Sequence, residues 1–430
     1  MERKKRIWFG LSIAVLGSAA ATPALAANAG RPVAVVPFPA LQFAQDEGEG
    51  GEGEGGEGGA VTVADYRLRS TDPNAYQYDA SKQVAAYSNL VRESYAAAHA
   101  DAVQLQGAVS ALLANPDENT LAEARLAWIN ARPAYLQTEA FRFYGGPVDE
   151  ALGRRINAWP LNAAYLDYVR GKPTAGLINN TTIEIDLGNL VGRNFVGGDE
   201  NVTTGWHAIE FLLWGEDASA TGPGARPATD FVRGQRNNDR RRNALTLATD
   251  LLVHDLASLV TAWDPERENF RSNLAAMDQR NAIGHIFHGI VVLAGYELAA
   301  KRMRWSLVGD EAEYEQSRFS DTTNADLVFA VRGIRNVYFG SANGAEGAGF
   351  DALLAGIDAD LNNRVIATLN HAERAVAALD APYDRILASP PGSPARAEAE
   401  AAVVALQELA EVLQAAGNRL GVLVLTLPKG

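Results

Sequence analysis

The residues best suited to chemistry lie in one short segment, Gly205-Trp206-His207-Ala208-Ile209-Glu210-Phe211-Leu212-Leu213-Trp214-Gly215. His207 and Glu210 are three residues apart, so on a helix both side chains leave the same face. An imidazole and a carboxylate placed in this way can bind one borderline or hard metal ion, as Glu-x-x-His pairs do in di-iron bundles. Two ligands do not complete a metal site, and a structural hydrogen-bonded pair is the alternative interpretation of this spacing.

A second set of polar side chains recurs at helical intervals upstream of this segment. Trp128, Arg132, Tyr135, Glu139 and Arg142 are separated by four, three, four and three residues, which places them along one stripe of a helix. A core stripe would be aliphatic, whereas this one alternates aromatic and charged groups. A buried charge has to be paired or used in binding. The spacing therefore predicts either the wall of a polar cleft or a surface stripe of ion pairs.

A third candidate is a pair of histidines, His285 and His288, in Gly284-His285-Ile286-Phe287-His288-Gly289. Their neighbours in the sequence are strongly apolar. A buried structural pair and a heme- or metal-ligating pair are both compatible with this pattern. His99, His254 and His371 are isolated on predicted helices, and we expect no functional role for them.

The elements that must position these residues are helical. Apolar residues recur at three-and-four spacing over most of the chain after Tyr78. Residues 171–203 are the least helical stretch, with a short β-like patch at 181–187. No alternation is long enough for a sheet, so we expect an all-α fold built as helical bundles. The predicted helices cover about 78–115, 117–143 with a kink at Pro133, 204–214, 238–262, 270–303, 324–337, 347–378 and 394–422.

The N-terminal region is predicted to lie outside the folded part. Residues 1–26 combine a basic cluster, a short apolar run and Ala24-Leu25-Ala26, which together are typical of a cleaved signal peptide. Residues 46–59 contain only glycine and acidic residues, so we expect a flexible acidic linker over 27–59. The remaining length exceeds what one core usually serves, which predicts a helical bundle over 60–235 that carries the His-x-x-Glu motif, a second over 236–430, and a cleft between them.

Composition excludes several classes of function. The chain has no cysteine, so disulfides, iron–sulfur clusters, thiolate zinc sites and cysteine nucleophiles are excluded. Its formal net charge of −14 argues against a nucleic-acid partner, because phosphate backbones attract basic surfaces. An acidic surface suits a cationic ligand better, although net charge alone does not identify one.

Six sequence blocks in a fixed order make the chain recognisable. They are residues 131–143, 156–161, 205–215, 295–303, 317–321 and 333–340. In this order they resemble the imelysin-like family, and in particular its iron-regulated protein A branch. The resemblance covers about residues 76–425, and the ordered set is far more specific than any single block.

The resemblance implies a fold, a location and a site. The family consists of two helical-bundle domains with a Gly-x-His-x-x-Glu motif, is exported to the periplasm or outer membrane, and is linked to iron acquisition. It also carries a peptidase label from its founding member. The implied metal ligands are His207, Glu210, Glu139 and Asp321, and Arg132 and Gly205 match the same family blocks. Together with Trp128 and Arg142 of the stripe and with Ser317, they are the residues that we expect to line the cleft. The family histidine of the block after Ser320-Asp321 is replaced here by Asn324.

We therefore expect an exported protein that binds iron, or an iron-bearing small molecule, in a cleft between the domains. Zinc or another divalent metal is a further candidate cofactor, and a second component of a cell-envelope uptake system is a candidate partner. One alternative is a metallopeptidase, although the His-Glu-x-x-His motif of helical zinc peptidases is missing from the sequence. The other is an interaction module that binds no metal itself.

Overall fold

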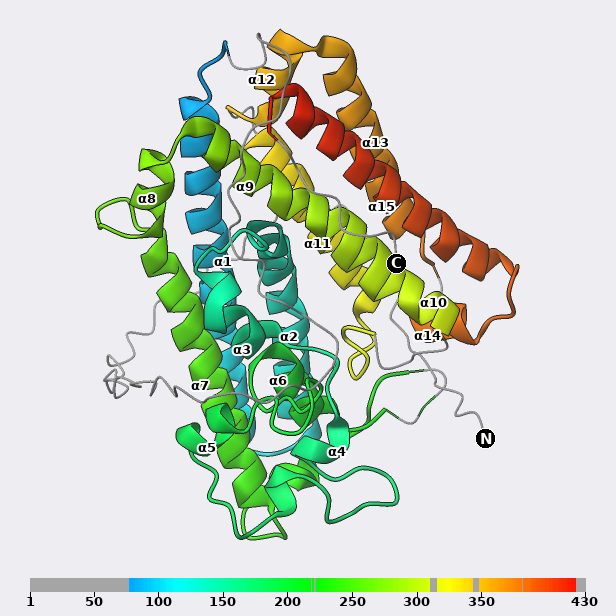
Figure 1. Ribbon diagram of the computed structural model, residues 1–430. Helices are drawn as coiled ribbons and strands as arrows, with labels where there is room; N and C mark the ends of the chain where they lie inside the picture. The colour runs from blue at the N-terminus through cyan, green and yellow to red at the C-terminus, as the bar shows by residue number, and fades with distance from the viewer. Residues whose placement is uncertain are drawn as a thin grey trace, which may run out of the picture. The chain divides into compact units, whose positions relative to one another are not determined.

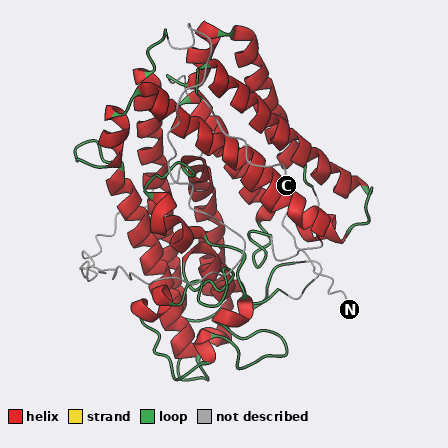
Figure 2. Cartoon of the chain, viewed as in Figure 1, coloured by secondary structure: helices red, strands yellow, loops and turns green. Residues whose placement is uncertain are grey.

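The computed structural model describes residues 77–217, 219, 222–309, 315–342, 348–380 and 382–422. Within these ranges the chain is helical, and the only β contact is an isolated antiparallel bridge between Val169 and Lys172 (Figure 2). The expected all-α fold is confirmed. The predicted signal peptide at 1–26 and the linker at 27–59 lie outside the described residues.

The first half of the described chain contains two long helices and then several short elements (Figure 1). In chain order they are α1 (Ser81–Ala114), α2 (Glu118–Gln137), the 3₁₀ turn η1 (Thr138–Phe141), the π turn η2 (Val148–Leu152), α3 (Gly153–Asn157), α4 (Ala163–Leu166), η3 (Leu177–Asn179), α5 (Leu187–Gly192), α6 (Gly205–Trp214) and η4 (Ala228–Phe231).

The second half is built mainly from long helices. In chain order they are α7 (Asn238–Ala262), α8 (Phe270–Ala276), α9 (Gln279–Val292), the π segment η5 (Leu293–Arg304), α10 (Trp305–Gly309), α11 (Thr323–Phe339), α12 (Phe350–Ile357), α13 (Ala359–Ala377), α14 (Tyr383–Ala388) and α15 (Pro394–Arg419).

Capping side chains set several helix boundaries. Asp117 forms a capping box at the start of α2: its carboxylate accepts from the backbone N–H of Thr120, and the Thr120 hydroxyl accepts from the N–H of Asp117. The stripe helix predicted for 117–143 is shorter than expected. Regular α-helix ends at Gln137, and the chain tightens into η1, which carries Glu139.

Three other predicted elements also differ from the structure. The helix expected over 270–303 is divided into α8, α9 and η5, and the one expected over 347–378 breaks at Asp358, whose carboxylate caps α13. The β-like patch at 181–187 forms no strand. Instead, the Asp186 side chain accepts from the N–H of Asn189 and caps the N-terminus of α5. The cap satisfies a backbone N–H group that a single unpaired strand would leave without a partner.

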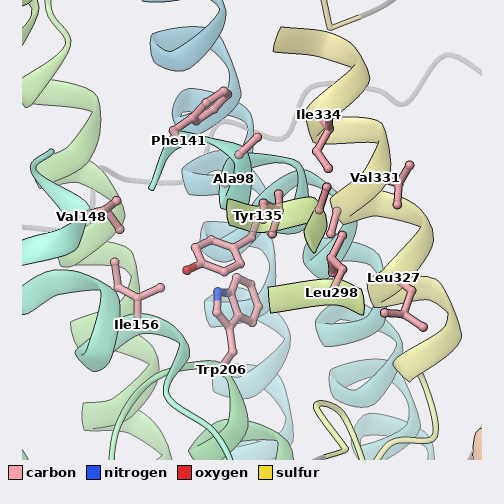
Figure 3. Close-up of a cluster of buried hydrophobic side chains, with 14 of the residues drawn as sticks. Ala98, Tyr135, Phe141, Val148, Ile156, Trp206, Leu298, Leu327, Val331 and Ile334 are labelled. Carbon is pink, nitrogen blue, oxygen red and sulfur yellow. The ribbon is translucent and has the colours of Figure 1, made fainter. Parts of the chain in front are cut away.

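Helices from distant parts of the sequence pack together. α1 lies against α2 and α7, α13 lies against α15, and α11 packs on α2 (Figure 1). Figure 3 shows a part of the core with Ala98 from α1, Tyr135 from α2, Trp206 from α6, Leu298 from η5 and Val331 from α11. α9 and η5 form a core segment in which most side chains are buried. The division into two bundle domains at residue 235 stays a prediction.

One glycine allows the close approach of α11 to the α2–η1 junction. A Cβ atom at Gly333 would lie 2.3 Å from the carbonyl oxygen of Gln137. Only glycine lets the two backbones meet at this distance. The contact fixes the turn that carries Glu139 against α11, and so joins an early polar segment to a late one.

Candidate functional site

The glycine of the motif has a structural role. Gly205 begins α6 with a φ of 82°, and an added Cβ would lie 2.3 Å from the carbonyl oxygen of Ile156. A left-handed backbone and a close approach both require glycine here. Gly205 therefore sets the N-terminus of α6 directly against α3, which places His207 in the first turn of a buried helix.

His207 and Glu210 form a buried hydrogen-bonded pair. The His207 Nδ1 atom lies 2.7 Å from Glu210 Oε2, and the two side chains are 1% and 0% exposed. The other Glu210 oxygen, Oε1, accepts from the N–H groups of Phe319 and Ser320 at 3.0 and 2.9 Å and from the Ser320 hydroxyl at 2.8 Å. Both oxygens of Glu210 are therefore engaged, whereas His207 Nε2 is buried without any partner.

The protonation of this pair follows from its surroundings. Burial, reinforced by the Arg132 charge, holds the pKa of His207 well below its usual range, so the imidazole is neutral at pH 7. Burial raises the pKa of Glu210 to about 7, although the hydrogen bonds from Ser320 and Phe319 favour its carboxylate. When Glu210 is ionised it can only accept, so Nδ1 carries the proton and Nε2 keeps its lone pair.

The polar stripe of α2 faces this motif. Arg132 is 2% exposed and donates to Asn157 Oδ1 and to Asp326 Oδ2, each at 2.8 Å. Its guanidinium lies 5.3 Å from the ring centre of Trp128 and 5.6 Å from that of Trp206. The stripe is therefore buried and paired, and a surface stripe of ion pairs is excluded.

Glu139 forms the second half of the same network. It is fully buried and accepts from Arg142 Nη1 at 2.9 Å, Arg302 Nη2 at 2.5 Å and Asn157 Nδ2 at 3.3 Å. Burial opposes ionisation, but Arg142 and Arg302 prevail and hold the pKa of Glu139 at about 2. Arg302 comes from η5, where the π turn also brings Glu297 within 3.5 Å of its guanidinium.

These residues form one network around His207. Arg132, Asp326, Arg302 and Glu139 all act electrostatically on its imidazole. The structure thus brings together the motif and the polar stripe, as expected for a shared site. Ser317, another expected cleft residue, lies in the same network and donates to Asp326 Oδ2 at 2.5 Å. The metal-ligating roles of these side chains stay predictions.

Four members of this network escaped the sequence analysis. Asn157, Arg302 and Ser320 lie inside the recognised blocks, so their place in an ordered block was a usable signal. Asp326 lies between two blocks and at no helical interval from another candidate. Nothing local in the sequence distinguishes it, and its role depends on a partner that is 194 residues away.

Asp321 lies in a different electrostatic setting. It is 1% exposed, has a left-handed φ of 61°, and its Oδ1 atom has no partner. Burial, together with Asp217 and Asp384, raises its pKa to about 9. A metal ligand has to be deprotonated, so the neutral carboxyl expected at pH 7 would first have to lose its proton.

His285 and His288 lie on α9, away from the α6 motif in the sequence, and are packed into the core. They are 7% and 3% exposed, and the ring of His285 lies 5.9 Å from that of Tyr144 in an edge contact. Burial lowers the pKa of both, that of His288 to about 4. Asn324, which replaces a family histidine, donates to the carbonyl of Leu379 at 2.8 Å. These surroundings favour structural roles for all three.

The described residues contain no ready-made metal centre. Within that part of the chain, no group of three or more His, Asp or Glu side chains is arranged to hold a metal ion. When Glu210 is ionised, the network offers one buried imidazole nitrogen with a free lone pair, bordered by guanidinium groups.

Comparison with known proteins places the chain among relatives. The imelysin family model matches residues 91–413. "Iron-regulated protein A" of Synechococcus elongatus is 28% identical over 334 residues, which span 75% of this chain and 82% of that protein. A crystal structure from Parabacteroides distasonis, described as an iron-regulated protein A precursor, aligns with a TM-score of 0.63 at 18% identity and covers 79% of this chain and 94% of that one. At that identity the structural likeness indicates a common fold.

Proposed function

Because this chain belongs to the imelysin family, we propose that it has the iron-related role that the names of its relatives indicate, and that His207 Nε2 binds the iron. The family match and the iron-regulated relatives support the general role. The assignment of His207 comes from the geometry of the network. In this role iron is a cargo that the protein takes up and releases.

One observation carries the proposal: a buried imidazole nitrogen that has no partner, in a ring whose other nitrogen is fixed by a carboxylate. Buried polar atoms are almost always hydrogen-bonded, so an exception calls for an explanation. Metal-ligating histidines usually donate their second N–H to a carboxylate or carbonyl, which fixes the tautomer and the ring orientation. Glu210 holds His207 in this way.

The surroundings suit an uncharged ligand nitrogen. Metal binding requires a neutral imidazole, and burial keeps His207 neutral throughout the physiological range. Imidazole suits iron, zinc and other transition metals alike, so zinc or another divalent ion is a competitor for the same atom. The predicted signal peptide at 1–26 would place this binding in the periplasm or at the outer membrane, beside other envelope components of iron uptake.

The peptidase alternative finds little support in the network. A zinc peptidase needs about three protein ligands and a general base beside an activated water. Both Glu210 oxygens accept hydrogen bonds already, and Glu139 is held by two arginines. An interaction module without metal is the remaining alternative, and the iron content of the purified protein separates it from iron binding.

The test is the iron content of protein recovered from an iron-replete periplasm. Wild type, His207→Gln and His254→Gln should be compared by mass spectrometry of bound metals, with circular dichroism to verify folding. His254, which is 48% exposed, controls for adventitious binding to surface histidines. We expect iron in wild type and His254→Gln and its loss in His207→Gln. Equal iron content in all three would remove His207 from the binding site.

A further inference from the structure

The network also indicates the chemical form of the iron. Resting on the proposed function, we infer that the cargo is iron already held in a small anionic chelate with oxygen ligands, and that a bare hydrated ion is a poor ligand. The inference comes from counting which polar atoms around His207 are engaged and which are left without partners.

The protein offers too few ligand atoms for a bare ion. Both oxygens of Glu210 and both oxygens of Glu139 accept hydrogen bonds. Asp326 Oδ2 accepts from Arg132 and Ser317, which leaves only its Oδ1 atom without a partner. Among the described residues that pair directly with one another in this network, the ligand atoms left without a partner are His207 Nε2 and Asp326 Oδ1; Asp321 Oδ1 belongs to a carboxyl whose pKa is raised. Protein sites for bare non-heme iron supply about three ligands, so here the cargo has to bring most of its own.

The atoms left over are mostly hydrogen-bond donors. The Nε–H groups of Arg132, Arg142 and Arg302 are all buried without an acceptor, and all three residues pair with carboxylates of this one network. Leaving a buried donor unpaired is costly, and the cost is greater for a charged group. Guanidinium groups are the preferred partners of carboxylate oxygens. An anionic chelator would supply the acceptors that the network lacks.

Charge around His207 points in the same direction. The carboxylates of Glu139 and Asp326 are already paired with the guanidinium groups of Arg132, Arg142 and Arg302. Carboxylates that are already paired with guanidinium groups offer little compensation for the charge of an added bare cation. A chelate carries the ion with its charge compensated, so the same guanidinium groups attract it.

Two other occupants are outcomes of the test. Ordered water could satisfy the unpaired donors, because buried waters commonly bridge such groups. Heme also has an iron with an open position for one imidazole, but it needs an apolar slot, and the groups around His207 are largely charged. The chelate is the occupant that uses both the lone pair and the unpaired N–H groups.

The experiment is equilibrium dialysis of the mature chain, residues 27–430, against ferric iron in excess citrate, with separate radiolabels on iron and citrate. Anaerobic ferrous sulfate, citrate alone and hemin are the other probes. Wild type should retain iron and citrate together, at least tenfold more tightly than ferrous iron. His207→Gln should lose both labels. The double variant Arg302→Gln/Glu139→Gln, which removes one charge of each sign, should weaken chelate binding about tenfold, and His254→Gln should match wild type.

The outcomes separate this inference from the proposed function. His207-dependent retention of iron without citrate, tighter binding of bare ferrous iron, or preference for hemin would each overturn the chelate and leave His207 as the iron ligand. Citrate retained equally in wild type and His207→Gln would also overturn it. No His207-dependent binding of iron in any form would overturn both. If the double variant does not fold, Arg142→Gln takes its place, since Glu139 then keeps Arg302.

Discussion

Two buried groups of carboxylates lie close together in this protein and behave in opposite ways. In the arginine network around His207, burial is overcome by guanidinium groups, and the pKa of Glu139 falls to about 2. In the acidic cluster, formed by Asp217, Asp321, Asp384 and Glu315, few cations are present, and the pKa of Asp321 rises to about 9.

The difference teaches that burial alone does not decide the charge of a side chain. Glu139 and Asp321 are 0% and 1% exposed, and burial disfavours the charged form of both carboxyl groups. Arg142 and Arg302 donate directly to Glu139, whereas Asp321 has Asp217 and Asp384 as its neighbouring charges. Glu139 in the network is consequently ionised and ion-paired, whereas Asp321 in the cluster is expected to be protonated at pH 7. Glu210 links them, because it contacts His207 with one oxygen and the Phe319–Ser320 backbone with the other.

The largest expected effect comes from breaking an ion pair in the arginine network. Arg132→Met leaves Asp326 charged and buried without its partner, which should lower the free energy of unfolding by about 3–5 kcal/mol. Urea denaturation followed by circular dichroism measures it. Arg154→Met, which breaks an exposed pair with Asp199, is the control and should cost less than about 1 kcal/mol. Comparable losses in both variants would contradict the importance of burial.

A smaller loss of stability is expected at Glu210, the residue that links the arginine network and the acidic cluster. Ser320→Ala removes one of three donors to Glu210 Oε1 and should cost about 1.5–2 kcal/mol, since the acceptor can be charged. It should also weaken the preference of His207 for a proton on Nδ1. Nitrogen-15 NMR of the six histidines reports the tautomer directly, with His207→Gln used for assignment. Ser320→Thr should restore the wild-type spectrum, and an unchanged tautomer in Ser320→Ala would end this role for Ser320.

The acidic cluster should make the stability of the fold depend on pH. The pKa of Asp321 is raised on folding, so the folded state holds a proton that the unfolded state loses, and stability is lost as pH rises from about 4 to about 9. Asp321→Asn keeps the shape, tolerates the left-handed backbone and cannot ionise. It should be more stable than wild type at pH 9 by on the order of 1 kcal/mol and should show a flatter pH profile. Parallel pH profiles of the two proteins in thermal unfolding would refute the assignment.

The smallest effect is expected at the second histidine pair. His285 and His288 are packed in the core of α9 and belong to neither group of carboxylates. The double variant His285→Gln/His288→Gln should therefore keep the wild-type iron content, although its stability will fall. Metal analysis of the folded fraction decides the matter. Loss of iron there, with retention in His207→Gln, would move the binding site to α9.

The sequence by itself determined the helices and much of the candidate site. Apolar periodicity and the three-residue spacing of His207 and Glu210 are local features, and the structure places both residues on the expected helix. The alternation of aromatic and charged groups in the stripe left a polar cleft and a surface stripe of ion pairs both open, and burial in the fold decided between them. The local inferences succeed because helix formation depends on residues within a few positions of one another.

Tertiary structure alone decided which side chains meet. The partners of Arg132, Glu139 and Glu210 come from positions 194, 163 and 110 residues away, and no local pattern encodes such pairings. Spacing made Glu210 a second metal ligand, whereas in the fold both of its oxygens are engaged and His207 presents the single unpartnered nitrogen. Likewise, Asp321 and Glu139 were both expected to be metal ligands from the sequence. Direct ion pairs with Arg142 and Arg302 keep Glu139 ionised, whereas burial and the neighbouring Asp217 and Asp384 favour a proton on Asp321. Charge state depends on neighbours in space, and only the packed helices supply them.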